Sequence, residues 1–238
     1  MYRDYHYFAF ADLYFDDLIM SVPSFIPAVL YGLMYLLVLI IWLGIRKFLK
    51  QSENNKKQLI RKNRVARNYD VFINTLEKQE KLDLPEPAFV LGNKDSDLEL
   101  TILTSLYCGM CKEMSEIIDR IIFAYPDQIK INIFFKTQAS EEKNHYVYLL
   151  HSIFLLHGEK EFLQALNFWF KNKNLALWKI DEYNVEENKE TFKSSNEWFA
   201  QNGIISTPSV FIDGYVYPYE FEKEDLFYHI EQIIENKE

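Results

Sequence analysis

The stretch SLYCGMCKEM, residues 105–114, carries Cys108 and Cys111, the only two cysteines of the 238-residue chain. The segment LELTILTSL (98–106) precedes the pair and predicts a strand that enters the core. An amphipathic pattern over 110–123 predicts a helix directly after it. Cys108 is therefore expected at a helix N-terminus, where unpaired backbone N–H groups and the helix dipole stabilise a thiolate.

The thiolate is the reactive form of cysteine, so this position predicts a nucleophilic Cys108. Cys111 follows one helical turn later on the same side of the helix. The pair has the order of an attacking thiol, Cys108, which forms a mixed disulfide, and a resolving thiol, Cys111, which releases it. The Cys108–Cys111 disulfide is then the redox-active group, and we expect no separate cofactor.

Two other roles for the thiol pair are weaker. A zinc site needs two further ligands, and with no other cysteine they would have to be histidines. His151 and His157 lie six residues apart, a spacing that does not put them on one helix face. A structural disulfide across two residues would stabilise little, because a short loop loses little chain entropy when it is closed. We therefore expect no metal.

The segments around the pair predict an α/β domain. IKINIFF (129–135) alternates as a second strand, and a largely helical stretch runs from about 140 to 201. SVFIDG and YVYPYEF (209–221) predict two strands around an Asp-Gly turn, and KEDLFYHIEQIIEN (223–236) predicts a closing helix. The expected order is strand, helix, strand, helical insertion, hairpin, helix.

A second motif, GIISTPSVFIDG (203–214), places Thr207 and Pro208 directly before a predicted strand. Together with a C-x-x-C that follows a strand, it resembles the thioredoxin fold of the membrane-associated, Dsb-type disulfide oxidoreductases. The resemblance implies thiol–disulfide exchange and a cis Thr207–Pro208 bond that lies against the cysteines and excludes metal. It also implies that the backbone of Thr207 pairs with an incoming peptide in strand-like fashion.

The resemblance extends to the C-terminal part of bacterial vitamin K epoxide reductase-like fusion proteins, over roughly residues 40–238. In those proteins a quinone-reducing membrane domain precedes a thioredoxin-like domain. The sequence here holds one apolar helix and no cysteines for such a membrane domain, so we expect a separate quinone-linked membrane oxidoreductase as electron partner. The motifs that carry the resemblance are RNYDVFINTLEKQEKLDLP, LGNKDSDLELTILTSLYCGMC, NEWFAQNGIISTPSVFIDGYVYP and EKEDLFYHI.

Three positions depart from the pattern of these proteins. Leu106 stands where a proline is common, and Lys112 stands where a small residue is usual. Ile102 occupies the position at which thioredoxins often bury a carboxylate as proton relay. Proton transfer to Cys111 would then need water or another group.

A membrane anchor is expected ahead of the domain. Residues 18–45 carry no charge, and about 20 apolar residues suffice to cross a bilayer. The expected division is a short N-terminal segment (1–17), a transmembrane helix region (18–45), a basic juxtamembrane helix or linker (46–84) and the thioredoxin-like domain (85–238). The prolines of LPEPAF, residues 84–89, set the last boundary.

The charge distribution and the expected chemistry give conflicting indications of the membrane topology. Residues 46–67 carry nine Lys or Arg and one Glu, which places the following domain in the cytoplasm by the positive-inside rule. Disulfide exchange and the family resemblance place it outside, and we expect the extracytoplasmic, periplasmic side. Residues 68–238 carry 16 basic and 30 acidic side chains, which argues against nucleic acid as a partner.

The expected function is a membrane-tethered thiol–disulfide oxidoreductase that acts on protein or peptide thiols and disulfides. Its electron flow can run in either direction, and the uncharged Gly109-Met110 pair favours a less oxidising centre. Tyr107, Met110 and Ile205 are candidate apolar substrate contacts. The alternative is a non-catalytic binding module of the same fold, which recruits a membrane or peptide-export partner.

Overall fold

The computed structural model describes residues 25–138, 141–175, 177–178 and 185–237. The chain divides into two compact units, Met1–Lys62 and Asn63–Glu238. The expected N-terminal segment 1–17 and the first residues of the expected membrane region, 18–24, lie outside the described part.

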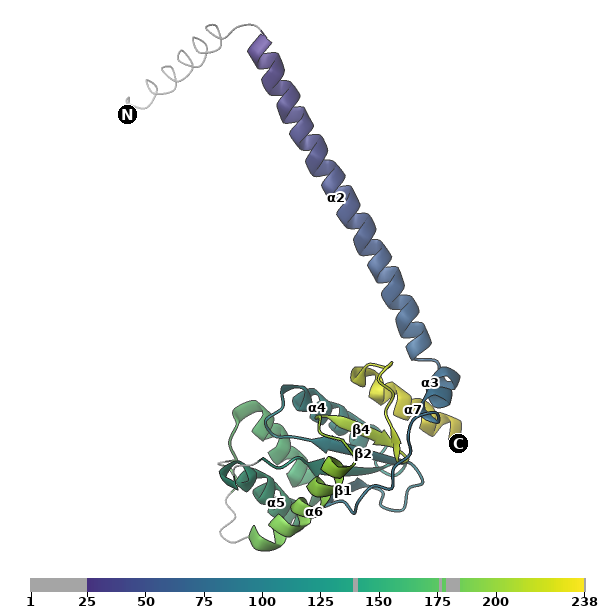
Figure 1. Ribbon diagram of the computed structural model, residues 1–238, viewed down its shortest axis with the longest axis vertical. Coiled ribbons are helices and arrows are strands. Elements are labelled where there is room, and N and C mark those ends of the chain that lie inside the picture. The colour runs from purple at the N-terminus through teal and green to yellow at the C-terminus, as the bar shows by residue number, and fades with distance from the viewer. Residues whose placement is uncertain (1–24, 139–140, 176, 179–184, 238) are drawn as a thin grey trace, which may run out of the picture. The chain divides into compact units, whose positions relative to one another are not determined.

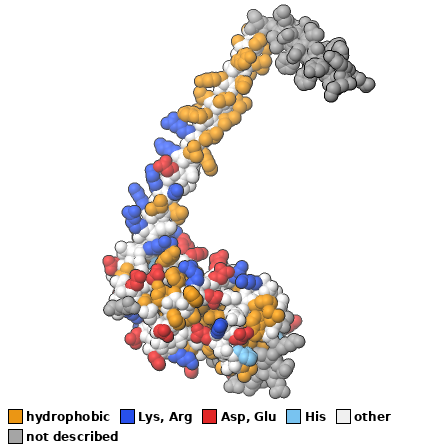
Figure 2. Space-filling view, turned by 180° about the vertical axis from the view of Figure 1, so that it is seen from behind, with side chains coloured by type: hydrophobic (Ala, Val, Ile, Leu, Met, Phe, Trp, Pro, Cys, Tyr) orange, Lys and Arg blue, Asp and Glu red, His pale blue; other side chains and the backbone are white. Residues whose placement is uncertain are grey.

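The described part of the first unit is the long helix α2 (Phe25–Ala66), which continues into the start of the second unit. Its first half exposes apolar side chains around the whole circumference, and its second half carries Lys and Arg (Figure 2). Glu53 and Lys57 form an ion pair of 2.7 Å along it. By length and composition, α2 could cross a membrane.

The second unit contains a five-stranded mixed sheet with the strand order β1-β3-β2-β4-β5 (Figure 1). The two central strands, β2 and β3, are parallel, and all other neighbours are antiparallel. The strands are β1 (Phe89–Gly92), β2 (Glu99–Thr104), β3 (Lys130–Phe135), β4 (Ser209–Ile212) and β5 (Tyr215–Val216). The helices are α3 (Tyr69–Leu76), α4 (Gly109–Ala124), α5 (Glu141–Asn172), α6 (Val185–Gln201), the 3-10 turn η1 (Lys223–Asp225) and α7 (Leu226–Lys237).

The two faces of the sheet carry separate hydrophobic clusters, as the alternation of side chains along a strand requires. In β2, Leu100 and Ile102 point into the larger cluster, which α3, α4, α5 and α7 complete. Leu103 points to the other face, where it packs with Phe199 of α6 and with Phe211 of β4. Every residue of β2 after Glu99 is buried. Both faces are therefore covered, and β2 is a rigid base for the segment that follows it.

Among the described residues, the helical insertion comprises α5 and α6. The helical geometry of α5 breaks at Gly158, which has a φ of +81°, and α6 follows after a connection that is only partly described. Trp178, in the described part of this connection, donates from Nε1 to Glu161 at 2.6 Å.

The second unit begins at Asn63, whereas the sequence placed the domain boundary at residue 85. The physical reason is α3, which begins at the N-cap Asn68 and buries Phe72 and Leu76 in the larger cluster. The ring of Phe72 stacks on the fully buried His229 of α7 at 3.8 Å between centroids. The stretch expected as a linker is thus part of the core in its second half.

Residues 80–82 lie along the outer side of β5. Glu80 accepts a hydrogen bond from the backbone of Val216, and Leu82 donates one to Gly214. Lys81 forms a β-bridge with Tyr215, and its amine lies 4.8 Å from the centre of the tyrosine ring. The segment that enters the domain thereby covers this edge of the sheet.

Candidate active site

The thiol pair lies at the junction of β2 and α4. Cys108 is the N-cap of α4, with extended backbone dihedral angles, and its N–H donates to Ser105 at 3.3 Å. Leu106 is buried in this turn, and its carbonyl accepts a 3.0 Å hydrogen bond from the indole of Trp169 in α5. The turn that precedes the motif is therefore held from the helical insertion.

The two thiols have unequal environments. Cys108 is half-buried, whereas Cys111 is 0% exposed, and both are free thiols. Burial raises the pKa of Cys108, but hydrogen bonds to its sulfur outweigh that effect, so its pKa lies below the ordinary thiol value. These hydrogen bonds come from the Cys111 thiol, the Thr207 side chain and the backbone N–H groups of Met110 and Cys111. Burial raises the pKa of Cys111.

The Thr-Pro motif reaches the thiols because β4 is antiparallel to β2. Leu103 pairs with Ser209, so the residues directly before Ser209 lie beside the residues directly after β2. The Thr207–Pro208 bond is cis. The Sγ atom of Cys108 lies 3.2 Å from the carbonyl oxygen of Thr207. Two motifs far apart in the sequence thus form one site.

The other predicted contact residues surround this site unevenly. Met110 and Ile205 are 63% and 67% exposed. Tyr107 is 43% exposed, its hydroxyl donates to the carbonyl of Lys143, and its ring meets Trp169 edge-on. Burial raises the pKa of the Tyr107 hydroxyl.

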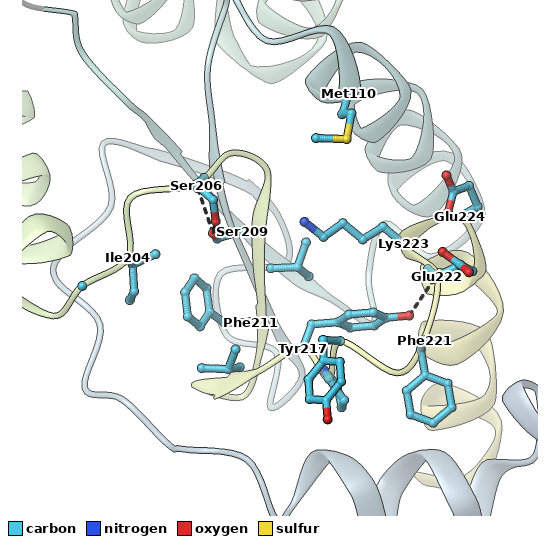
Figure 3. Close-up of a pocket in the computed structure, with 15 residues that line it drawn as sticks. Met110, Ile204, Ser206, Ser209, Phe211, Tyr217, Phe221, Glu222, Lys223 and Glu224 are labelled. Carbon is cyan, nitrogen blue, oxygen red and sulfur yellow. Dashed lines mark hydrogen bonds between the residues drawn. The ribbon is translucent and has the colours of Figure 1, made fainter.

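A pocket of about 530 Å³ opens beside the thiol helix, between the loop before β4 and the segment after β5 (Figure 3). Its lining includes Met110 of α4, Ser206 of the loop before β4, Ser209 at the start of β4, and Tyr217 and Lys223 of the segment after β5. The Nζ atom of Lys223 donates to the carbonyl of Pro208. Lys223 was not predicted from the sequence, because no motif marks it and only the packing of η1 brings it to the site.

Within the described residues, no three His, Cys, Asp or Glu side chains form a group that could hold a metal ion. His229 of α7 lies in the core, stacked on Phe72 of α3.

The fold of the second unit and its site can be compared with solved structures. A periplasmic thioredoxin-like protein from Salmonella enterica serovar Typhimurium superimposes with a TM-score of 0.50 at 18% identity, over 70% of this chain and 95% of that one. The chain has a thioredoxin-like fold. The fold predicted from the sequence, with its helical insertion, is confirmed.

Two further structures agree with this assignment. The thiol-disulfide exchange protein alpha-DsbA2 from Wolbachia pipientis matches with a TM-score of 0.51 at 15% identity, over 75% of this chain and 98% of that one. DsbA2 of Pseudomonas aeruginosa matches with a TM-score of 0.51 at 16% identity, over 64% of this chain and 97% of that one. No protein-family model matches the sequence, and no curated protein matches it significantly.

Proposed function

We propose that the chain is a membrane-tethered thiol–disulfide oxidoreductase that acts on protein or peptide thiols and disulfides. The observation that carries this proposal is the asymmetry of the thiol pair. Cys108 is accessible at a helix N-terminus with a lowered pKa, and Cys111 is buried one turn away with a raised pKa. The thioredoxin-like fold, shared with a thiol-disulfide exchange protein, supports the same chemistry.

In the reducing direction, the Cys108 thiolate attacks one sulfur of a substrate disulfide. A Cys108–substrate disulfide forms, and the other substrate sulfur leaves as a thiolate. Cys111 then loses its proton and attacks Cys108, which releases the second substrate thiolate and leaves the Cys108–Cys111 disulfide. Two electrons have passed to the substrate, and the oxidising direction is the reverse of these steps.

The accessible groups around Cys108 are assigned to substrate binding. The backbone of Thr207, beside the cis Pro208, is proposed to pair with an extended substrate segment next to the attacked disulfide. Tyr107, Met110 and Ile205 are exposed around the thiols and offer apolar contacts to the flanking substrate side chains.

Helix α2 is proposed to anchor the protein in a membrane, with the thioredoxin-like unit on the extracytoplasmic side. The support is its length and apolar composition, together with the persistence of disulfides outside the cytoplasm. A separate quinone-linked membrane oxidoreductase is proposed to exchange electrons with the thiol pair, in the role that the fused membrane domain has in the vitamin K epoxide reductase-like proteins that the sequence resembles.

Trapping tests the chemistry. Full-length protein with Cys111→Ser is expected to accumulate disulfide-linked adducts through Cys108, visible as slower bands on non-reducing gels that disappear with dithiothreitol. Because the variant lacks the resolving thiol, the mixed disulfide persists. The matched control carries Cys108→Ser as well and should form no adducts. Adduct levels no higher than in this control would favour a non-catalytic binding module.

Labelling of intact cells tests the topology. A membrane-impermeant thiol reagent, applied after mild reduction, is expected to modify Cys108 without lysis. Labelling that requires lysis would place the unit in the cytoplasm and would favour a reductase.

A further inference from the structure

Lys223 lies close enough to the thiol pair for negative charge on Cys108 and Cys111 to affect its amine, although it is distant from the pair in the sequence. It is the first residue of η1, the short 3-10 turn between the β4–β5 hairpin and α7. This turn packs against α4. In Figure 3 its side chain extends across the pocket near Met110, with the amine directed toward the loop that carries Ser206 and Ser209. The side chain is half-buried, so its amine is partly removed from water.

Consecutive carbonyl groups of one loop contact the thiol and the amine. The Thr207 carbonyl lies 3.2 Å from the Cys108 sulfur, and the Pro208 carbonyl accepts from Lys223 Nζ. The loop thereby fixes a positive charge near the place where a thiolate forms.

The electrostatics agree with this placement. Burial lowers the pKa of Lys223, while negative charge on Cys111 and Cys108 acts in the opposite direction and favours the ammonium. Such an interaction is mutual, so the ammonium in turn favours the thiolates, in addition to the hydrogen bonds that chiefly lower the pKa of Cys108. Other titratable groups face Lys223 in this pocket: Glu222 and Tyr217 line it, and Glu224, which also favours the ammonium, follows in η1.

We propose that Lys223 is a positioning residue whose ammonium stabilises the thiolate of the reduced pair. The inference rests on the proposed function, because it assigns the charge that tunes that exchange. An ammonium that favours the thiolate stabilises the reduced form over the disulfide. Lys223 therefore makes the centre more oxidising than the uncharged Gly109-Met110 pair alone would predict.

The test compares Lys223→Gln and Lys223→Met with the wild type, as full-length protein in detergent. The rate of Cys108 alkylation by iodoacetamide is followed against pH on reduced protein, with mass spectrometry to separate the two cysteines. Loss of the charge is expected to move the midpoint of the Cys108 profile upward by about one pH unit, which is at the low end of the shifts that a neighbouring charge causes. Below the midpoint, the thiolate fraction is then roughly tenfold lower. Lys223→Met retains the aliphatic stem, so it provides a second charge-free variant if Lys223→Gln folds poorly.

Two variants control for general charge effects. Lys112→Gln removes an exposed ammonium directly after Cys111 on α4 and should move the profile much less, because exposed charges are screened. Lys223→Arg keeps the charge and should restore a profile close to that of the wild type. An unchanged profile in both charge-free variants, or an equal shift in Lys112→Gln, would overturn the inference.

The equilibrium with glutathione separates this inference from the proposed function. Both charge-free variants are expected to favour the disulfide about tenfold more than the wild type, which corresponds to about 30 mV for a two-electron couple. A wild type that never interconverts between dithiol and disulfide would refute the proposed function. The alkylation profile still decides the role of Lys223 in that case.

Discussion

Acidification is expected to destabilise the second unit through His229. This ring is fully buried and stacked on Phe72, and burial lowers its pKa below the ordinary value of 6.5. Below pH 6.5 the unfolded chain binds a proton at this position that the folded chain does not. The free energy of unfolding therefore falls as the pH falls, by at most about 1.4 kcal/mol per pH unit, until the folded pKa is reached.

The hydrogen bonds of the ring explain why the neutral form fits. The carbonyl of Ala66 can only accept, so Nε2 carries a hydrogen and donates to it at 2.9 Å. In the neutral ring, Nδ1 then accepts from the Tyr217 hydroxyl, which lies 2.9 Å away. A protonated ring would donate at Nδ1, and the Tyr217 hydrogen would have to turn fully to the Glu222 carbonyl, 3.0 Å away. Asp225 favours the proton, whereas Arg67 opposes it.

Urea unfolding of full-length protein in detergent, at several pH values between 5 and 8, measures the effect. His229→Phe retains the stack on Phe72 but leaves the Ala66 carbonyl unpaired, so at pH 7.5 it should be less stable by about 1–3 kcal/mol. Because phenylalanine does not titrate, this gap should narrow as the pH falls below 6.5. Asp119, whose pKa burial raises, changes stability in the opposite direction, but equally in both proteins. A gap that stays constant from pH 8 to pH 5 would refute the reasoning.

Two substitutions test the fold around the site. Gly92→Ala should lower the stability of the unit by more than about 1 kcal/mol, because Gly92 has a φ of +73° and a Cβ there would lie 2.5 Å from the Ile129 carbonyl. Gly109→Ala, with no atom within 4 Å of its Cβ, is the matched control and should leave the urea midpoint unchanged or raised; equal losses would contradict the steric explanation. Trp169→Phe should cost about 1–3 kcal/mol, since it leaves the buried Leu106 carbonyl without its donor. An unchanged midpoint by circular dichroism would show that this hydrogen bond contributes nothing.

The sequence predicted the elements with strong periodicity and the residues with distinctive chemistry. The strands at 98–106 and 129–135 and the helix after Cys108 appear within a few residues of their predicted bounds. The proximity of Thr207 to Cys108 followed from a resemblance rather than from the pattern of residues. The physical cause, the antiparallel register of β2 and β4, is a tertiary property.

What the sequence did not predict depends on packing. Strand β1 has only four residues, too few for an alternating pattern, and its pairing with β3 forms it. The helix α3 looked like part of a linker because Phe72 reveals its buried role only beside His229. Lys223 lies in a charged stretch of sequence that is typical of a solvent-exposed surface. The expectation of a less oxidising centre considered only Gly109 and Met110, the two residues between the cysteines.

The pairing of residues 80–82 with β5 affects whether the protein can associate with other chains through this edge of the sheet. A bare sheet edge offers unpaired N–H and C=O groups as a template for strands of other chains. Here the entering segment occupies the edge beside Tyr215 and Val216. Proteins tethered to a surface meet each other at high local concentration, and those that exchange disulfides also meet unfolded chains. Under the proposed function, the covered edge therefore keeps β5 from serving as a template for such chains.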